Sequence, residues 1–303
     1  MMTFDILKVW VKSLVSEKGT GKALEKLITA TIGYAASIFS FSVLLNDLAN
    51  FDKLEIYWKN HWWFLFVLGF ICSLFHNHEK ISCKGIQRDN DQQIEVKINN
   101  LFSIKASSYV IPTNSFFRTI MDDEYVSPRS VQGAFQLKYF RKDKNFNTLD
   151  QKIAESLNKQ GLEGIDDEDI HGPVKKYPLG TVAKVDHKNK HFYFVAINDV
   201  NKYGKPENQT YGNIDIALTG LVEAINKMGH CDDFAMPLLG TGRAAIKDAS
   251  IDKVVMDIVD KFSDSHDKIA RKLIICIRPG DYLDGLVNLK RIGKYIDYKC
   301  EFK

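Results

Sequence analysis

The sequence predicts an α/β domain that is preceded by a two-helix transmembrane hairpin. Three observations lead to this prediction. Residues 27–45 contain no charged side chain, and a second apolar run follows at 62–75. From about Ile86 onward, strand-like and helix-like segments alternate, which is the pattern of a sheet with helices on both faces. A glycine-bearing loop at 236–243 connects an apolar strand to a helix.

Length and composition bound the classes of function. The 303 residues allow one large domain or two ordinary ones. The formal net charge is only +3, so composition argues against a nucleic-acid-binding protein. The five cysteines form no Cys-X-X-Cys pair and have no histidine at zinc spacing. This usage favours reduced, cytosolic cysteines and predicts no metal site.

The two apolar runs predict membrane spans. About twenty apolar residues cross the hydrocarbon core of a bilayer, and residues 27–45 come close to that length without any charge. The second run becomes long enough when it is extended back to Tyr57, with the ammonium group of Lys59 reaching the interface. The predicted spans are therefore about 27–45 and 57–75. The alternative is a helical hairpin buried in a soluble core.

Basic residues predict the orientation of this hairpin. Five lysines precede the first run, and Lys80, Lys84 and Arg88 follow the second. The connecting loop, residues 46–56, carries three acidic residues and one lysine. The positive-inside rule then predicts a multi-pass protein of the cell inner membrane with both termini in the cytoplasm.

The first 24 residues are expected to form an amphipathic helix. Apolar side chains such as Leu7, Trp10 and Leu14 share one broad face, and lysines lie elsewhere. Such a helix lies in the membrane interface, packs on a neighbouring subunit or covers its own domain. The expected organisation is an amphipathic helix at 1–24, a hairpin at 25–80 and a cytoplasmic domain at 85–303.

Periodicity and turn residues predict the elements of the soluble part. The expected strands are 93–98, 109–112, 181–185, 191–197, 234–239, 272–277 and, at an edge of the sheet, 295–302. The expected helices follow an N-cap at Ser127 and an N-cap at Asn147, and also cover 214–228 and 248–262. Residues 164–172 are acidic and are expected to form a loop.

Three segments follow predicted strands at the edge where open α/β sheets bind ligands: 113–117, 198–201 and 240–243. Glycines in the last segment let backbone N–H groups approach a phosphate, and the following helix adds its dipole. Arg243 can pair with the same phosphate. Asn114 suits a pair of ribose hydroxyls, and the alternative is a turn asparagine.

The ligand loops resemble those of macro domains, which bind ADP-ribose. Residues 110–114 and 237–242 look like the two ligand loops of that family. More narrowly, the chain resembles the macro-like domain of Thoeris anti-phage effectors at residues 114–117, 122–123, 126–127, 130–133 and 177–181. In one branch of these effectors, a double-spanning membrane segment precedes the macro domain. The resemblance implies a macro-like α/β fold, with a mixed sheet flanked by helices.

The resemblance also implies a function. The macro-like domain is expected to bind an ADP-ribose-derived messenger, histidine-ADP-ribose, made by a TIR-domain protein during infection. Binding is expected to trigger assembly of several copies and disruption of the membrane lipid, with death of the cell. The expected ligand-binding residues are Asn114, Ser115, Phe116, Phe117, Asp123, Gln132, Gly133, Asn198, Leu239, Gly240, Thr241, Gly242 and Arg243. No cofactor or metal is expected.

Macro domains that hydrolyse ADP-ribosyl bonds hold a water molecule between a glycine-rich loop and the substrate. This chain carries Phe116, Phe117 and Arg118 in that loop, so binding without turnover is expected. One alternative is a membrane-tethered ADP-ribosyl hydrolase, for which Asp122 and Asp123 are the candidate acids. Another is a membrane anchor with an empty macro fold.

Overall fold

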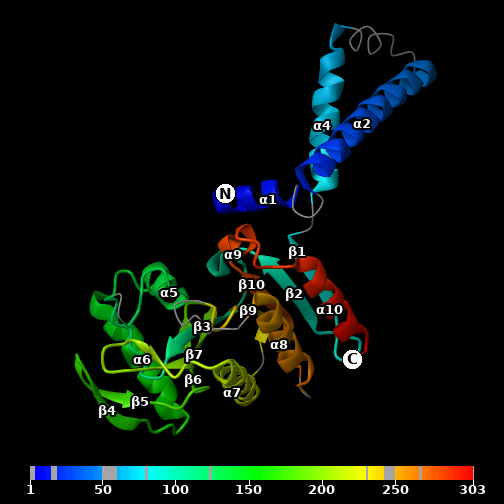
Figure 1. Ribbon diagram of the computed structural model, residues 1–303. Helices are drawn as coiled ribbons and strands as arrows, with labels where there is room; N and C mark the ends of the chain where they lie inside the picture. Colours follow the sequence, from blue (N-terminus) through cyan, green and yellow to red (C-terminus); the bar gives the residue numbers. More distant parts are fainter. Residues whose placement is uncertain are drawn as a thin grey trace. The chain divides into compact units, whose positions relative to one another are not determined.

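The computed structural model describes residues 4–14, 19–49, 60–78, 81–122, 125–229, 231–241, 250–265 and 268–302. The chain divides into two compact units, residues 1–81 and 82–303 (Figure 1). The first unit is helical, and the second contains a sheet with helices on both of its faces.

The first unit contains α1 (Phe4–Ser13), α2 (Gly19–Ala49) and α4 (Trp62–Asn77), and α2 and α4 pack against each other. Gly69 allows their close approach. A Cβ atom at this position would lie 2.5 Å from the carbonyl oxygen of Thr31 and 3.0 Å from the backbone nitrogen of Ala35. The Ser73 hydroxyl donates to the Leu27 carbonyl at 2.9 Å, which adds an interhelical hydrogen bond to the same seam.

The described residues contain one helix that is long and apolar enough to cross a membrane. It covers Ala23–Leu45 within α2. The α4 helix is apolar but shorter, and Tyr57 and Lys59, which extend the second predicted span, lie outside the described residues. The predicted amphipathic helix at 1–24 corresponds in part to α1, which ends at Ser13. The α2 helix, which contains the apolar span, begins at Gly19, inside the range predicted for the amphipathic helix.

The second unit is built on an eight-stranded sheet. Its strands are β1 (Ser82–Ile86), β2 (Gln93–Ile98), β3 (Ser108–Asn114), β6 (Val182–His187), β7 (Lys190–Val200), β8 (Pro206–Glu207), β9 (Cys231–Pro237) and β10 (Ala270–Ile277). The strand order is β1-β2-β10-β9-β3-β7-β6, and β8 pairs with β7. The five inner strands are parallel, whereas β1 and β6 are antiparallel to their neighbours. The predicted mixed sheet is confirmed.

Helices cover both faces of this sheet (Figure 1). One face carries α5 (Val131–Tyr139) and α6 (Asn147–Lys159), and the other carries α7 (Gly212–Met228), α8 (Ile251–Ser263) and α10 (Leu289–Glu301), with the short α9 (Pro279–Leu283) before α10. On the first face, the Phe135 ring lies 4.6 Å from that of Phe192 and 5.2 Å from that of Phe194. On the second, Phe234 contacts Phe262 of α8. Burial of these aromatic rings supplies much of the apolar packing on each face.

The sequence-based assignment of the inner strands is confirmed. The strands predicted at 93–98, 109–112, 181–185, 191–197, 234–239 and 272–277 are β2, β3, β6, β7, β9 and β10, and the helix predicted at 214–228 is α7. The helix predicted at 248–262 is α8, which begins at Ile251 after its N-cap Ser250, while residues 242–249 lie outside the described residues.

The prediction of an edge strand at 295–302 is wrong, because residues 295–301 belong to α10. Ile292, Ile296 and Cys300 recur every four residues and are all buried, which is the spacing of one face of a helix. The actual edge strand on this side of the sheet is β1, which the sequence did not indicate.

The prediction of a loop at 164–172 is also wrong. This segment forms most of an antiparallel hairpin of β4 (Ile165–Asp169) and β5 (Gly172–Lys176). Acidic residues are poor strand formers, so the sequence did not favour a strand here. Tertiary contacts override that propensity, because the Arg118 guanidinium makes two hydrogen bonds to the Asp169 carboxylate, at 2.8 and 2.9 Å.

Two predicted helix caps are displaced. The N-cap of α5 is Ser130, whose hydroxyl accepts from Gly133 N at 2.9 Å, whereas Ser127 lies in the preceding turn. The α6 helix begins at Asn147 itself, its N-cap is Phe146, and an upstream aspartate supplies the side-chain acceptor for its first turn. Asp143 Oδ2 accepts from Thr148 N at 2.9 Å, so it satisfies an N–H group that lacks a partner within the helix.

Candidate ligand-binding site

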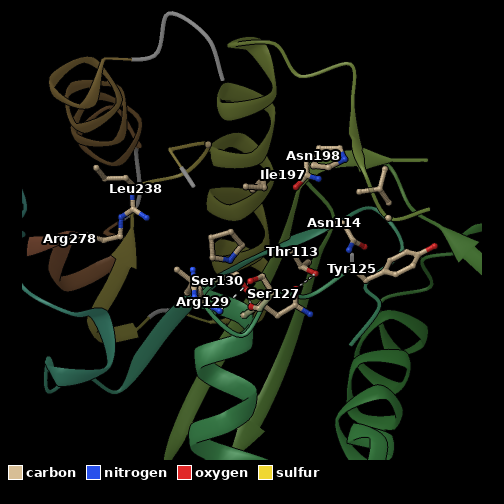
Figure 2. Close-up of a pocket in the computed structure, with 17 residues that line it drawn as sticks. Thr113, Asn114, Tyr125, Ser127, Arg129, Ser130, Ile197, Asn198, Leu238 and Arg278 are labelled. Carbon is tan, nitrogen blue, oxygen red and sulfur yellow. Dashed lines mark hydrogen bonds between the residues drawn. The ribbon is translucent and has the colours of Figure 1, made fainter. Parts of the chain in front are cut away.

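A cavity of about 550 Å³ lies at the carboxyl ends of the parallel strands. Its walls come from the ends of β3 and β7, the residues that follow β9 and β10, the first turn of α5, and the segments around Tyr125 and Gly204 (Figure 2). Residue segments that are distant in sequence therefore meet at one edge of the sheet. The volume lies within the range of small-molecule and cofactor sites.

Asn114 is a turn residue whose side chain also lines the cavity. Its Oδ1 accepts from Phe116 N at 3.0 Å, which makes it a turn residue. The side chain is only 5% exposed and lines the cavity. Its amide nitrogen donates to no protein atom in the described part of the chain. A ligand in the cavity can accept hydrogen bonds from that group.

Gln132 and Asn198 also line the cavity, and the amide of Gln132 is committed to the protein. Gln132 Oε1 accepts from the Thr113 hydroxyl at 3.0 Å, and its Nε2 donates to the Arg118 carbonyl at 2.9 Å. Asn198 is the direct neighbour of Asn114 across the β3–β7 pairing. Gln132 therefore fixes the geometry of the wall, and the asparagine pair presents amides to the cavity.

Four other predicted ligand residues lie behind the wall instead of on it. The Ser115 hydroxyl donates to Asp199 Oδ1 at 2.7 Å, and Phe116 is buried in a small cluster with Tyr125. Phe117 belongs to the main core of the domain. Gly133 has no room for a side chain, because a Cβ atom would clash with the backbone of Ser127 and Pro128. These residues support the site by packing.

The glycine-bearing loop reaches the cavity through Gly240, which has a φ of +73° and lines it. This left-handed conformation suits glycine. Leu239 is fully buried, and the Thr241 carbonyl faces Arg278 Nη2 at 3.5 Å. Gly242, Arg243 and Asp123, which were also predicted to bind the ligand, lie outside the described residues.

Sequence reasoning missed two arginines that line the cavity. Arg278 directly follows β10 and is held by Asp281 through hydrogen bonds of 2.8 and 3.0 Å. Arg129 precedes the N-cap of α5, and its guanidinium has no ion-pair partner in the described part of the chain. The sequence did contain one indication that Arg278 lies at the cavity, because this residue directly follows the buried strand predicted at 272–277. Arg129 carried no local signal, because only the fold brings it to the cavity.

Tyr125, also missed, closes one side of the cavity. Its hydroxyl donates to the Lys202 carbonyl at 2.7 Å, and burial raises the pKa of its phenol, with a further contribution from the nearby Asp169 carboxylate. The Ile170 N–H donates to the same Lys202 carbonyl at 3.1 Å, so the β4–β5 hairpin is hydrogen-bonded to this wall.

The hairpin is held in place by a buried carboxylate. Burial alone would raise the pKa of the Asp169 carboxyl, but hydrogen bonds from Arg118 and from His171 N, together with the Arg118 charge, hold it below its usual value. The ion pair therefore stays intact at neutral pH. The described residues contain no group of three or more His, Cys, Asp or Glu side chains placed to hold a metal ion.

No curated protein matches the chain. Solved structures that it resembles include the Oceanobacillus iheyensis macrodomain with MES bound, at 12% identity and a TM-score of 0.47, covering 71% of this chain and 96% of that one. The same macrodomain with ADP has 11% identity and a TM-score of 0.41, covering 73% and 95%. The macrodomain of Thermus aquaticus DarG has 11% identity and a TM-score of 0.39, covering 62% and 98%.

A match to a family model shows which protein family the chain belongs to. The model described as "Thoeris protein ThsA, Macro domain" matches residues 94–278, which is more than half of the chain. The match begins in β2 and ends at Arg278, so it includes the described residues that line the cavity. The chain therefore belongs to the family of the Thoeris protein ThsA macro domain.

Proposed function

We propose that this protein is a ligand-gated membrane effector of anti-phage defence. Its macro domain binds an ADP-ribose-derived messenger, histidine-ADP-ribose, which a TIR-domain protein supplies. The observation on which this rests is the cavity at the strand ends, which combines two arginines, the Gly240 backbone and the Asn114 amide nitrogen, which donates to no atom in the described part of the chain. These are the groups that a diphosphate and a ribose require.

The diphosphate lies on the arginine side of the cavity. Arg129 and Arg278 are the only charged side chains among the described residues that line it. Gly240 lets the backbone come close to the phosphates, and the N-terminus of α5 directs its positive dipole end toward the same space. The Asn114 amide then binds a ribose hydroxyl.

Binding occurs without turnover, and the engagement of the two nearby acids that the structure describes, Asp122 and Asp199, supports this. Asp122 accepts from Tyr125 N at 2.9 Å and pairs with His171 at 3.0 Å. Asp199 accepts from Ser115 and pairs with Lys176 at 2.7 Å. Burial would raise the pKa of Asp199, but these two partners hold it below its usual value, which makes the carboxylate a weak base. A carboxylate that acts as the base of a hydrolase must be able to accept a proton from water.

The helical unit damages the membrane. The α2 helix crosses the bilayer over Ala23–Leu45, and α4 returns beside it, with both termini in the cytoplasm. The messenger shifts the population toward an arrangement in which several copies assemble, because it binds that arrangement more tightly. Small residues on the exposed face of α2, such as Gly33, Ala36 and Ser37, allow helices of neighbouring copies to approach closely.

Arg129→Gln is expected to weaken ADP-ribose binding about tenfold or more, because a hydrogen bond to a charged group contributes about 1.5–3 kcal/mol. The melting temperature should not change, since Arg129 has no ion-pair partner in the described part of the chain. Isothermal titration of the full-length protein in detergent measures the affinity. The matched control is Arg88→Gln, an exposed arginine that does not line the cavity. Equal affinities for both variants would place the phosphates elsewhere.

Asn114→Asp separates the two roles of that residue. The carboxylate still accepts from Phe116 N and keeps the turn, but the two N–H donors are lost and a negative charge is added near the phosphates. Affinity for ADP-ribose should fall about tenfold or more, because a bound ribose oxygen loses its partner. Melting temperature and affinity are measured together. A variant that melts and binds like the wild type would leave Asn114 with the turn role alone.

A further inference from the structure

Positive charge gathers on a surface patch at the end of the sheet opposite the cavity, where β7 begins. We define this basic patch by Lys138, Lys152, Lys188 and Lys190. None of these four lysines has an ion-pair partner in the part of the chain that the structure describes. The ring of Tyr139 on α5 lies 5.9 Å from that of His187 at the end of β6, so α5 and the β6–β7 turn adjoin here. Asp186, an acid beside the patch, is already paired with His191.

The lysines of the basic patch lie close enough to repel one another. Burial and the neighbouring Lys190 charge lower the pKa of Lys138. Burial and the charges of Lys188 and Lys152 likewise lower the pKa of His187. A partner with negative charge would relieve this repulsion, so the basic patch fits an anionic surface.

The opposite charge gathers on the β4–β5 hairpin, which forms a two-stranded sheet of its own (Figure 1). We call residues 163–176 the acidic hairpin, after its exposed acids Glu163, Asp166, Asp167 and Glu168. Asp166 is paired with Lys175 at 2.6 Å, whereas the other three acids have no ion-pair partner among the described residues. Ile165 lies between these acids and is 73% exposed. The acidic hairpin therefore offers both negative charge and an apolar contact to a partner.

The basic patch and the acidic hairpin of one copy cannot meet. Lys190 begins β7, whereas the acidic hairpin is bonded to residues at the far end of that strand. The Ile170 N–H donates to the Lys202 carbonyl at 3.1 Å, and Lys176 pairs with Asp199 at 2.7 Å. The β7 strand has 11 residues, and a rise of about 3.3 Å per residue separates its ends by about 30 Å. The two surfaces can therefore pair only between different copies.

The location of the basic patch favours a protein partner over the lipid surface. The chain enters the second unit at Ser82, which pairs with Lys97 near the carboxyl ends of the parallel strands. The basic patch lies at the amino ends, so it is not at the end of the sheet to which the helical unit is attached. Every copy of the chain also carries the acidic hairpin, so a partner of matching charge is always present.

We propose that the basic patch of one copy binds the acidic hairpin of the next copy, and that this contact joins the copies when they assemble. The inference rests on the proposed function, which requires assembly but leaves the contact open. Because the two surfaces differ, the contact repeats from copy to copy and produces a ring or a filament. Opposite charges also steer the copies together and fix their orientation.

The acidic hairpin adjoins the ligand cavity, which links assembly to ligand binding. Tyr125 lines the cavity, and its hydroxyl donates to the same Lys202 carbonyl that accepts from Ile170 N. The Arg118 guanidinium holds Asp169 at the end of β4. A ligand that shifts this wall therefore also shifts the acidic hairpin.

The test is a charge reversal on each surface, followed by sedimentation velocity of the full-length protein in detergent with histidine-ADP-ribose. The patch variant is Lys138→Glu with Lys188→Asp, since aspartate tolerates the positive φ of +53° at position 188. The hairpin variant is Asp167→Lys with Glu168→Lys. Each variant alone should lower the assembled fraction at least about tenfold, because like charges then face each other.

An equimolar mixture of the two variants should assemble again. The unchanged hairpin of one variant meets the unchanged patch of the other, and the substituted side chains meet with opposite charges. Wild-type assembly should also weaken at about 1 M salt, where the screening length is about 3 Å. The matched control is Lys227→Glu with Lys294→Glu, two exposed lysines on α7 and α10, which should assemble like the wild type.

Melting temperature and ADP-ribose affinity establish that each variant is folded. Assembly of either reversed variant at the wild-type level, or a mixture of folded variants that stays dispersed, would overturn the contact. A patch variant that assembles normally but loses affinity for duplex DNA would assign the basic patch to a nucleic acid and would also overturn it. A wild type that does not assemble with histidine-ADP-ribose would instead overturn the proposed function.

Discussion

Gly69→Leu is expected to abolish membrane permeabilisation while the protein still binds its messenger. The Cβ atom alone would lie 2.5 Å from the Thr31 carbonyl oxygen and 3.0 Å from Ala35 N, so α2 and α4 must separate. Separation also breaks the hydrogen bond from Ser73 to Leu27. Helices in a bilayer associate through close packing. When that packing is lost, lipid chains cover the separated helix surfaces, and no hydrophobic penalty opposes the separation. Release of a trapped dye from liposomes measures the effect.

The control for this variant is Gly21→Leu. Gly21 lies in α2, and a Cβ atom there would meet nothing within 4 Å. This substitution should leave dye release close to that of the wild type. ADP-ribose affinity, measured in detergent, should be unchanged in both variants. Dye release by Gly69→Leu at the wild-type rate would show that the α2–α4 seam is not required for membrane damage.

Gly133→Ala is expected to destabilise the macro domain by about 3 kcal/mol, the upper end of the range for overpacking. The new methyl group would clash with the Ser127 carbonyl oxygen and would lie 2.8 Å from Pro128 Cα. Both contacts are to backbone, so no side chain can rotate away. Since the first turn of α5 lines the cavity, binding should be lost with the local structure. Thermal melting followed by near-UV circular dichroism measures the loss of stability.

Gly293→Ala provides the comparison. It is also a glycine-to-alanine change within a helix, but its Cβ atom would lie at an ordinary 3.4 Å from Cys83 Cβ. Alanine favours the helix, so this variant should melt at or above the wild-type temperature. If Gly133→Ala instead melted normally and still failed to bind ADP-ribose, the residue would contact the ligand directly, as the sequence resemblance implied.

The inner sheet and the location of the cavity could be predicted from the sequence. Strands such as β2 and β10 are short apolar runs with clear boundaries, and their order along the chain alternates with helices. Parallel strands in such a sheet end at the same edge, so Asn114, Asn198 and Gly240 were expected to meet. The structure brings these three residues to one cavity.

Other features depend on tertiary contacts that leave no local pattern. Residues 295–302 show an alternation of polar and apolar side chains, but the buried positions of α10 follow a helical spacing that starts earlier, at Ile292. The β4 strand is acidic and forms because β5 pairs with it and Arg118 binds Asp169. Arg129 and Tyr125 reach the cavity only because the segment before α5 folds back over the strand ends.

The most direct test of the ligand-gated effector combines dye release with recovery of the ligand. Full-length protein is reconstituted into liposomes that contain a trapped dye, histidine-ADP-ribose is added, and the ligand is then analysed by chromatography. We predict that dye is released only when the ligand is present, and that the ligand is recovered intact. Release without ligand, no release at saturating ligand, or recovery of ADP-ribose and free histidine would contradict a ligand-gated effector that binds without turnover.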